Sequence, residues 1–196
     1  IEAVYADENA TYELTESVDI STFVPMISRP GKPHDSVQIS PNDKIKIDSA
    51  FIGSCTNCRL DFLRAAASVM KGRKIAPGVI LKIVPSTDKI WQEALEEGLI
   101  KIFKDAGALV SNAGCGGCAN GHVGQNGDRN FPGKQGKGSV YLASPATVAA
   151  SAVAGYITTE VEIPESPMEF KIGNMQNESH TDEKKATHSD NKKPVE

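Results

Sequence analysis

The sequence contains no apolar run that approaches the ~20 residues needed to span a bilayer. Its first residues, IEAVYADENATYEL, include neither the basic region nor the apolar region of a signal peptide. Basic residues are not in excess, because the net charge is −4, so there is no electrostatic reason to bind nucleic acid. Residue 1 is Ile rather than Met, from which we expect the chain to begin inside a longer gene product. We therefore expect neither a membrane nor a nucleic acid as a partner.

The chain has 196 residues, enough for one domain with a sizeable core, and only four cysteines. They lie in two short C-x-x-C stretches, GSCTNCRLDF at 53–62 and NAGCGGCANGH at 112–122. Without a secretion signal, such pairs are metal ligands or catalytic groups more often than a disulfide framework. A reducing compartment follows, either the cytoplasm or an organellar matrix.

Alternating strand and helix patterns occupy the middle of the chain. Residues 1–45 are expected to form an irregular lead-in, 46–160 an α/β domain, and 161–196 a polar, disordered tail or linker. Strands are expected at 46–53, 78–86, 108–112 and 139–144, and a weaker one at 18–23. Helices are expected at 56–72, 86–98, 99–107 and 144–156. This order predicts a mostly parallel sheet covered by helices on both faces, a three-layer α/β/α fold.

The helix ends carry recognisable capping residues. Thr56 or Asn57 is expected to cap the first helix, and Ser86 or Thr87 the second. The last helix has Ser144 as its N-cap, followed directly by a proline and closed by a glycine.

The residue types alone leave several kinds of site open. Cys55, Cys58, Cys115 and Cys118 have the right number for a four-thiolate zinc site, although zinc modules usually place their pairs ~15–20 residues apart. A C-x-x-C at a helix N-terminus is also typical of a redox dithiol. Glycines and alanines around the second pair leave room for a bulky iron–sulfur cluster, which thiolates also bind. Both pairs follow expected strands, so they could meet beyond the carboxyl ends of a sheet.

Three motifs resemble one known family when they are taken together. They are IGSCTN at 52–57, GCGGC at 114–118 and DRNFPGKQGKGSVYLASPATVAASAVAG at 128–155. In this order they resemble the aconitase-type iron–sulfur hydro-lyases, in particular the branch that contains the 3-isopropylmalate dehydratases and homoaconitases. The resemblance covers roughly residues 1–160. It implies the aconitase iron–sulfur domain fold and a hydro-lyase that acts on a hydroxy di- or tricarboxylic acid.

The resemblance also implies a cofactor and its ligands. Cys55, Cys115 and Cys118 would hold a [4Fe–4S] cluster whose fourth iron stays open to the substrate and acts as a Lewis acid. Cys58 stands where relatives have a small residue and would not be a ligand.

Substrate-binding residues and partners follow from the same resemblance. Arg129 and Lys134 would bind substrate carboxylates, and Asp128 would lie beside the cluster; His122 is a weaker candidate for a contact near the cluster. No catalytic base can be assigned in this chain. The implied partners are the missing N-terminal domains of a large subunit and a small swivel-domain subunit or domain.

Overall fold

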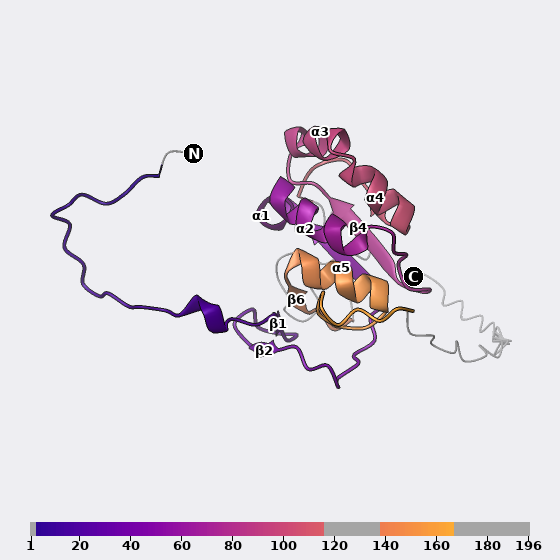
Figure 1. Ribbon diagram of the computed structural model, residues 1–196, viewed down its shortest axis with the longest axis horizontal. Coiled ribbons are helices and arrows are strands. Elements are labelled where there is room, and N and C mark those ends of the chain that lie inside the picture. The colour runs from indigo at the N-terminus through magenta and orange to yellow at the C-terminus, as the bar shows by residue number, and fades with distance from the viewer. Residues whose placement is uncertain (1–2, 116–137, 167–196) are drawn as a thin grey trace, which may run out of the picture.

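The computed structural model describes residues 3–115 and 138–166 (Figure 1). In chain order the elements are η1 (Ile20–Thr22), β1 (Met26–Ser28), β2 (Ser36–Gln38), β3 (Ser49–Gly53), α1 (Ser54–Asn57), α2 (Leu60–Met70), β4 (Ile80–Val84), α3 (Asp88–Glu96), α4 (Leu99–Ala106), β5 (Leu109–Val110), β6 (Leu142–Ala143) and α5 (Pro145–Ala154). None of the helices in these two ranges is both long and apolar enough to cross a membrane.

Strands β3, β4 and β5 form a parallel sheet with β4 in the centre. Ala50 and Ile52 of β3 and Leu81 and Ile83 of β4 are buried, while Phe51 and Lys82 between them are only partly buried. This period of two is what one covered sheet face produces. The predicted α/β fold class with a parallel sheet is confirmed.

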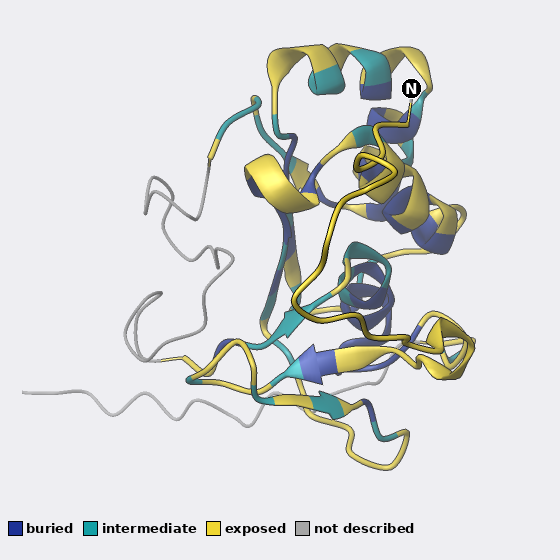
Figure 2. Ribbon diagram, turned by 90° about the vertical axis from the view of Figure 1, so that its left-hand side faces the viewer, coloured by how far each residue is buried: buried dark blue, intermediate teal, exposed yellow. Residues whose placement is uncertain are grey.

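Helices α2, α4 and α5 pack together over this sheet, with α5 against β3 and α4 against β5. In Figure 2 the buried residues gather where the helices meet the strands. On the opposite face Ile80 is 52% exposed and Leu109 is 54% exposed. Within the described residues, the helical cover of the sheet is therefore on one face. The largest fully buried side chains are Phe103, Ile52, Leu63, Met70, Leu81 and Ile83.

The capping residues expected for two helices are confirmed. The Ser144 hydroxyl accepts a hydrogen bond from the Thr147 amide at 3.2 Å, Pro145 opens α5, and Gly155 closes it with a φ of 88°. Thr87 caps α3 in the same way, through the amide of Ile90.

The helix expected at 56–72 is instead two helices. The chain leaves the helical path at Cys58, whose φ and ψ are −133° and 42°, and α2 starts after Arg59 as its N-cap. Thr56 and Asn57 lie inside α1 and at its end, so the expected cap was wrong. The reason is tertiary: the Cys58 side chain is buried in the core, and its carbonyl accepts a hydrogen bond from the amide of Ser86, a distant residue, and not from the next helical turn.

A second, antiparallel sheet joins segments that the sequence patterns did not connect. Its strand order is β2–β1–β6, and Ile27 of β1 pairs with both Val37 and Ala143. The strand expected at 139–144 is thus short and lies outside the parallel sheet. The weak strand expected at 18–23 is a 3₁₀ turn, η1. A small apolar cluster of Ile27, Ile39 and Ile157 holds this sheet to the domain. The domain boundaries near 45 and 160 stay predictions.

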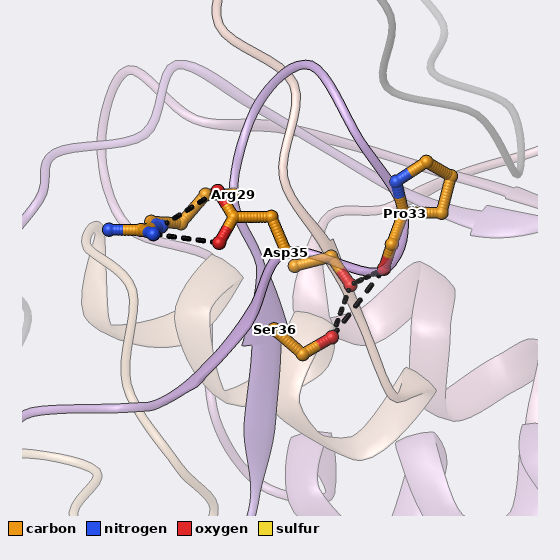
Figure 3. A network of polar contacts seen from close by, with 5 residues as sticks. Arg29, Pro33, Asp35 and Ser36 are labelled. Atoms are coloured by element: carbon orange, nitrogen blue, oxygen red, sulfur yellow. Dashed lines mark hydrogen bonds and ion pairs between the residues drawn. The ribbon is translucent and has the colours of Figure 1, made fainter.

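Polar contacts fix the turn between β1 and β2 (Figure 3). The Arg29 guanidinium donates two hydrogen bonds to the Asp35 carboxylate, at 3.1 and 2.7 Å, and the Ser28 hydroxyl donates to the Pro33 carbonyl at 2.7 Å. The hydrogen bonds from Arg29 lower the pKa of Asp35. The stabilisation from this pair is therefore lost as the pH falls through the lowered pKa of Asp35.

Leu63→Ala tests whether α2 closes the core as described. Leu63 is fully buried, so its truncation should lower the free energy of unfolding by about 2–5 kcal/mol, measured by urea denaturation. Phe62, its neighbour on α2, is 38% exposed and serves as the control. An equal loss from Phe62→Ala would contradict the described orientation of α2.

Candidate functional site

Cys55 lies where the first strand of the parallel sheet ends. β3 stops at Gly53, Ser54 turns the chain with a φ of 81°, and Cys55 is exposed on α1. Ser54 is the one non-glycine residue with a positive φ in the described ranges, and it is completely buried. A side chain rarely adopts this conformation unless the surroundings impose it. Packing around Ser54 thus determines where Cys55 points.

Gly53 allows a close approach of Phe51 at the same turn. A Cβ at position 53 would lie 2.2 Å from the tip of the Phe51 ring, so any side chain there would have to displace the ring. Packing against Phe51 therefore accounts for the glycine in the motif IGSC.

Cys115 reaches the same edge of the sheet from β5. Like Cys55, it is exposed. Its loop is fixed to the end of β4, because the Gly114 amide donates to the Pro85 carbonyl at 3.0 Å and the Ser111 amide donates to the Ile83 carbonyl at 3.0 Å. The segment after Cys55 is fixed to Ser86, the residue that follows Pro85, because the Ser86 amide donates to the Cys58 carbonyl at 3.2 Å. Consecutive residues after β4 thus hold both cysteine loops, as the sequence predicted for the carboxyl ends of the strands.

The side chain of Cys58 points away from this edge into the core, although its backbone is hydrogen-bonded there and Cys55 is only three residues away. Its side chain is fully buried among the core residues, and its Sγ lies 3.7 Å from the Ile52 carbonyl oxygen. Burial raises the pKa of this thiol to about 12. Cys58 is therefore a neutral core side chain, whereas Cys55 is exposed.

The remaining predicted site residues, Cys118, Asp128, Arg129 and Lys134, lie outside the described residues, as does His122. Within the ranges that are described, no group of three or more His, Cys, Asp or Glu side chains is placed to hold a metal ion. Two of the three predicted cluster ligands, Cys55 and Cys115, are thus placed at one edge.

The sequence patterns did not indicate a cavity that lies beside this edge. It has a volume of about 670 Å³ and runs between β3 and the segment 138–143. Gly53 and Asn57, which flank Cys55, are among its lining residues, together with apolar side chains such as Ile27 and Ile157 and polar ones such as Lys46 and Asp48. Its walls come from segments far apart in the chain, so no local pattern could have revealed it.

The fold and the site together define a class: an α/β domain that presents two exposed thiols at the carboxyl edge of a parallel sheet. Residues 1–155 match the sequence model of the aconitase family (aconitate hydratase). The chain belongs to the aconitase family, which confirms the resemblance that the three motifs indicated.

Its relatives include several 3-isopropylmalate dehydratase large subunits. The chain is 48% identical to that of Campylobacter hominis over 167 residues, which are 79% of this chain and 40% of the relative. It is 41% identical to that of Mycolicibacterium smegmatis over 169 residues, 80% of this chain and 40% of the relative. For Acetivibrio thermocellus the identity is 45% over 169 residues, with 81% and 40% covered. The chain thus spans about 40% of the length of these relatives.

The difference between Cys55 and Cys58 predicts a difference in thiol reactivity. In the native protein at pH 8, iodoacetamide should modify Cys55 and Cys115 and leave Cys58 unmodified, because the thiolate is the reactive form. Peptide mapping by mass spectrometry before and after addition of urea measures this. Equal labelling of Cys55 and Cys58 in the native protein would contradict the burial of Cys58.

Proposed function

We propose that this chain is the cluster-binding part of the large subunit of a hydro-lyase. Its substrate class is a hydroxy di- or tricarboxylic acid such as 3-isopropylmalate, and Cys55, Cys115 and Cys118 are the ligands of a [4Fe–4S] cluster. The observation that carries the proposal is the attachment of both cysteine-containing loops to the end of β4, through the carbonyl of Pro85 and the amide of Ser86. Membership of the aconitase family and the names of the relatives support it.

The donor set fits such a group. Thiolates are soft ligands that suit iron–sulfur clusters, and Cys55 and Cys115, the two proposed ligands among the described cysteines, are both exposed. Gly114, next to Cys115, has a φ of 157°, and no atom of the described residues lies within 4 Å of a Cβ placed on it. The backbone beside Cys115 therefore has space for a bulky inorganic group.

The burial of Cys58 favours three thiolate ligands over four. A zinc site on Cys55, Cys58, Cys115 and Cys118 is the alternative, and it would require the Cys58 thiolate to leave the core. The raised pKa of Cys58, about 12, opposes loss of its proton, and its place among the buried apolar residues opposes its movement out of the core. Three protein ligands leave one iron open, and a cluster of this kind supplies a Lewis acid for the substrate hydroxyl.

The charged residues of the DRNFPGK motif are the proposed substrate contacts. Arg129 offers a guanidinium that can bind a carboxylate through two hydrogen bonds, whereas Lys134 offers the charge without the fork. Asp128 would add a negative charge near an anionic substrate, so we expect it to be paired or protonated there. These roles rest on the resemblance of the motif.

Other parts of the enzyme complete the proposed site. The relatives are named large subunits and are longer than this chain, so the general base and further substrate contacts are proposed to come from the rest of the large subunit and from a small swivel-domain subunit or domain. Because thiolate ligands are sensitive to oxidation, a reducing compartment suits this assignment.

Anaerobic reconstitution with iron and sulfide tests the ligand set. The wild-type chain should bind about four irons and four sulfides per chain, as expected for one cubane cluster. Cys55→Ser, Cys115→Ser and Cys118→Ser should each lose most of this iron, and Cys58→Ala is the matched control that should retain it. Loss of iron only in Cys58→Ala, or tight binding of one zinc ion that depends on Cys58, would contradict the proposal.

The reconstituted chain alone should not dehydrate a hydroxy acid, because the general base is absent from it. Ultraviolet absorption of the unsaturated product, measured with 3-isopropylmalate as substrate, tests this. Turnover above that of the cluster-free chain would show that the base lies within these residues.

A further inference from the structure

The first part of the chain is an extended segment that projects away from the domain. Residues 3–24, here called the N-terminal arm, run outward from β1 and contain only the short turn η1 (Figure 1). Every residue of the arm is exposed, as Figure 2 also shows. Its hydrogen bonds within the described part join residues two or three positions apart, such as Ala10 with Asp7 and Phe23 with Ile20. The hydrogen bonds described for the arm are therefore local and do not connect it to the domain.

The composition of the arm does not suit a segment that stays in water. Single exposed apolar residues are ordinary on protein surfaces, but here many large ones occur in a short stretch. Tyr5 is 85% exposed and Leu14 is 72% exposed. The large apolar residues of the arm are Val4, Tyr5, Tyr12, Leu14, Val18, Ile20, Phe23 and Val24.

The middle of the arm has the pattern of a strand with one apolar side. In YELTESVDI at 12–20, the apolar residues occupy alternate positions, interrupted only by Glu16, and the positions between them are polar. In an extended backbone, alternate side chains point to the same side, so Tyr12, Leu14, Val18 and Ile20 share one side, with Glu16 in the middle of it.

The charge of the arm has one sign. Its charged residues are Asp7, Glu8, Glu13, Glu16 and Asp19, and no lysine or arginine occurs between 3 and 24. A surface that complements the arm would be largely apolar, with a lysine or arginine side chain opposite Glu16 and others along its border.

We infer that the N-terminal arm docks, in an extended conformation, on an apolar surface bordered by basic residues in the part of the large subunit that lies outside this chain. Two findings favour this occupant over others. The family match begins at residue 1, so the arm is within the matched region. The relatives are also much longer than the matched segment. The additional part of such a polypeptide could provide a surface that the arm covers permanently. The inference rests on that part of the proposed function which makes this chain a piece of a large subunit, and not on the cluster.

Co-expression with the complementary part of a relative tests the docking. The probe is the remainder of the Campylobacter hominis large subunit, outside the 40% that this chain matches, expressed as a soluble fragment with the tagged full chain. Wild type should co-purify with this fragment in a one-to-one complex.

Two double variants separate the apolar side of the arm from its polar side. Leu14→Asp with Val18→Asp places charges on the apolar side and should weaken the complex at least about tenfold, since buried apolar anchors dominate such interfaces. Thr15→Asp with Ser17→Asp adds the same charge on the other side and should leave the complex at least half as abundant as that of wild type.

Hydrogen exchange provides a second measurement that does not depend on the variants. Amides 12–20 should exchange at least about tenfold more slowly in the complex than in the free chain, because docking orders the arm. Absence of a complex with the soluble fragment, or equal effects of the two double variants, would overturn the inference. Protection already present in the free chain would also overturn it: protection that rises with concentration would assign the arm to a second copy, and constant protection would assign it to its own domain.

Discussion

The candidate site depends on the backbone at the end of the central strand β4. The Pro85 carbonyl accepts a hydrogen bond from the loop of Cys115, and the Ser86 amide donates to the turn that follows Cys55. β4 is paired on both sides, and Leu81, Ile83 and Val84 are almost completely buried, so these two residues are attached to the most firmly held strand of the domain. Two loops that are far apart in the sequence are thereby held at one edge by backbone hydrogen bonds, which would lower the entropy lost on binding the proposed cluster.

The two cysteines of the first C-x-x-C pair lie in different environments, one exposed and one buried. Ser54 turns the chain with a positive φ so that Cys55 faces solvent, and the next turn directs Cys58 into the core, where its thiol stays neutral. Cysteine spacing alone cannot distinguish this arrangement from a four-thiolate zinc site, because burial is a property of the tertiary structure. The uneven burial of the pair is what favours an iron–sulfur cluster with one open iron over zinc in our proposal.

Features with a local cause were predictable from the sequence, and features with a distant cause were not. Ser144 and Gly155 cap α5 through contacts within a few residues, so the pattern was sufficient to predict them. The break at Cys58 depends on core packing and on the Ser86 amide, which lies well beyond any local window. The pairing of β6 with β1, across more than half of the chain, likewise has no local signal. At the site, the strand-end positions of Cys55 and Cys115 were predictable, whereas the cavity beside them and the burial of Cys58 were not.

The central claim is that three cysteines, without Cys58, hold a cluster with one exchangeable iron. Electron paramagnetic resonance on the reconstituted Cys58→Ala chain, before and after mild oxidation, tests it most directly. The account predicts the loss of about one iron per cluster and the appearance of the signal of a three-iron cluster, since only the iron without a protein thiolate is weakly held. An oxidised sample that keeps all its iron and gives no such signal, or a chain that binds zinc in place of iron, would contradict the account.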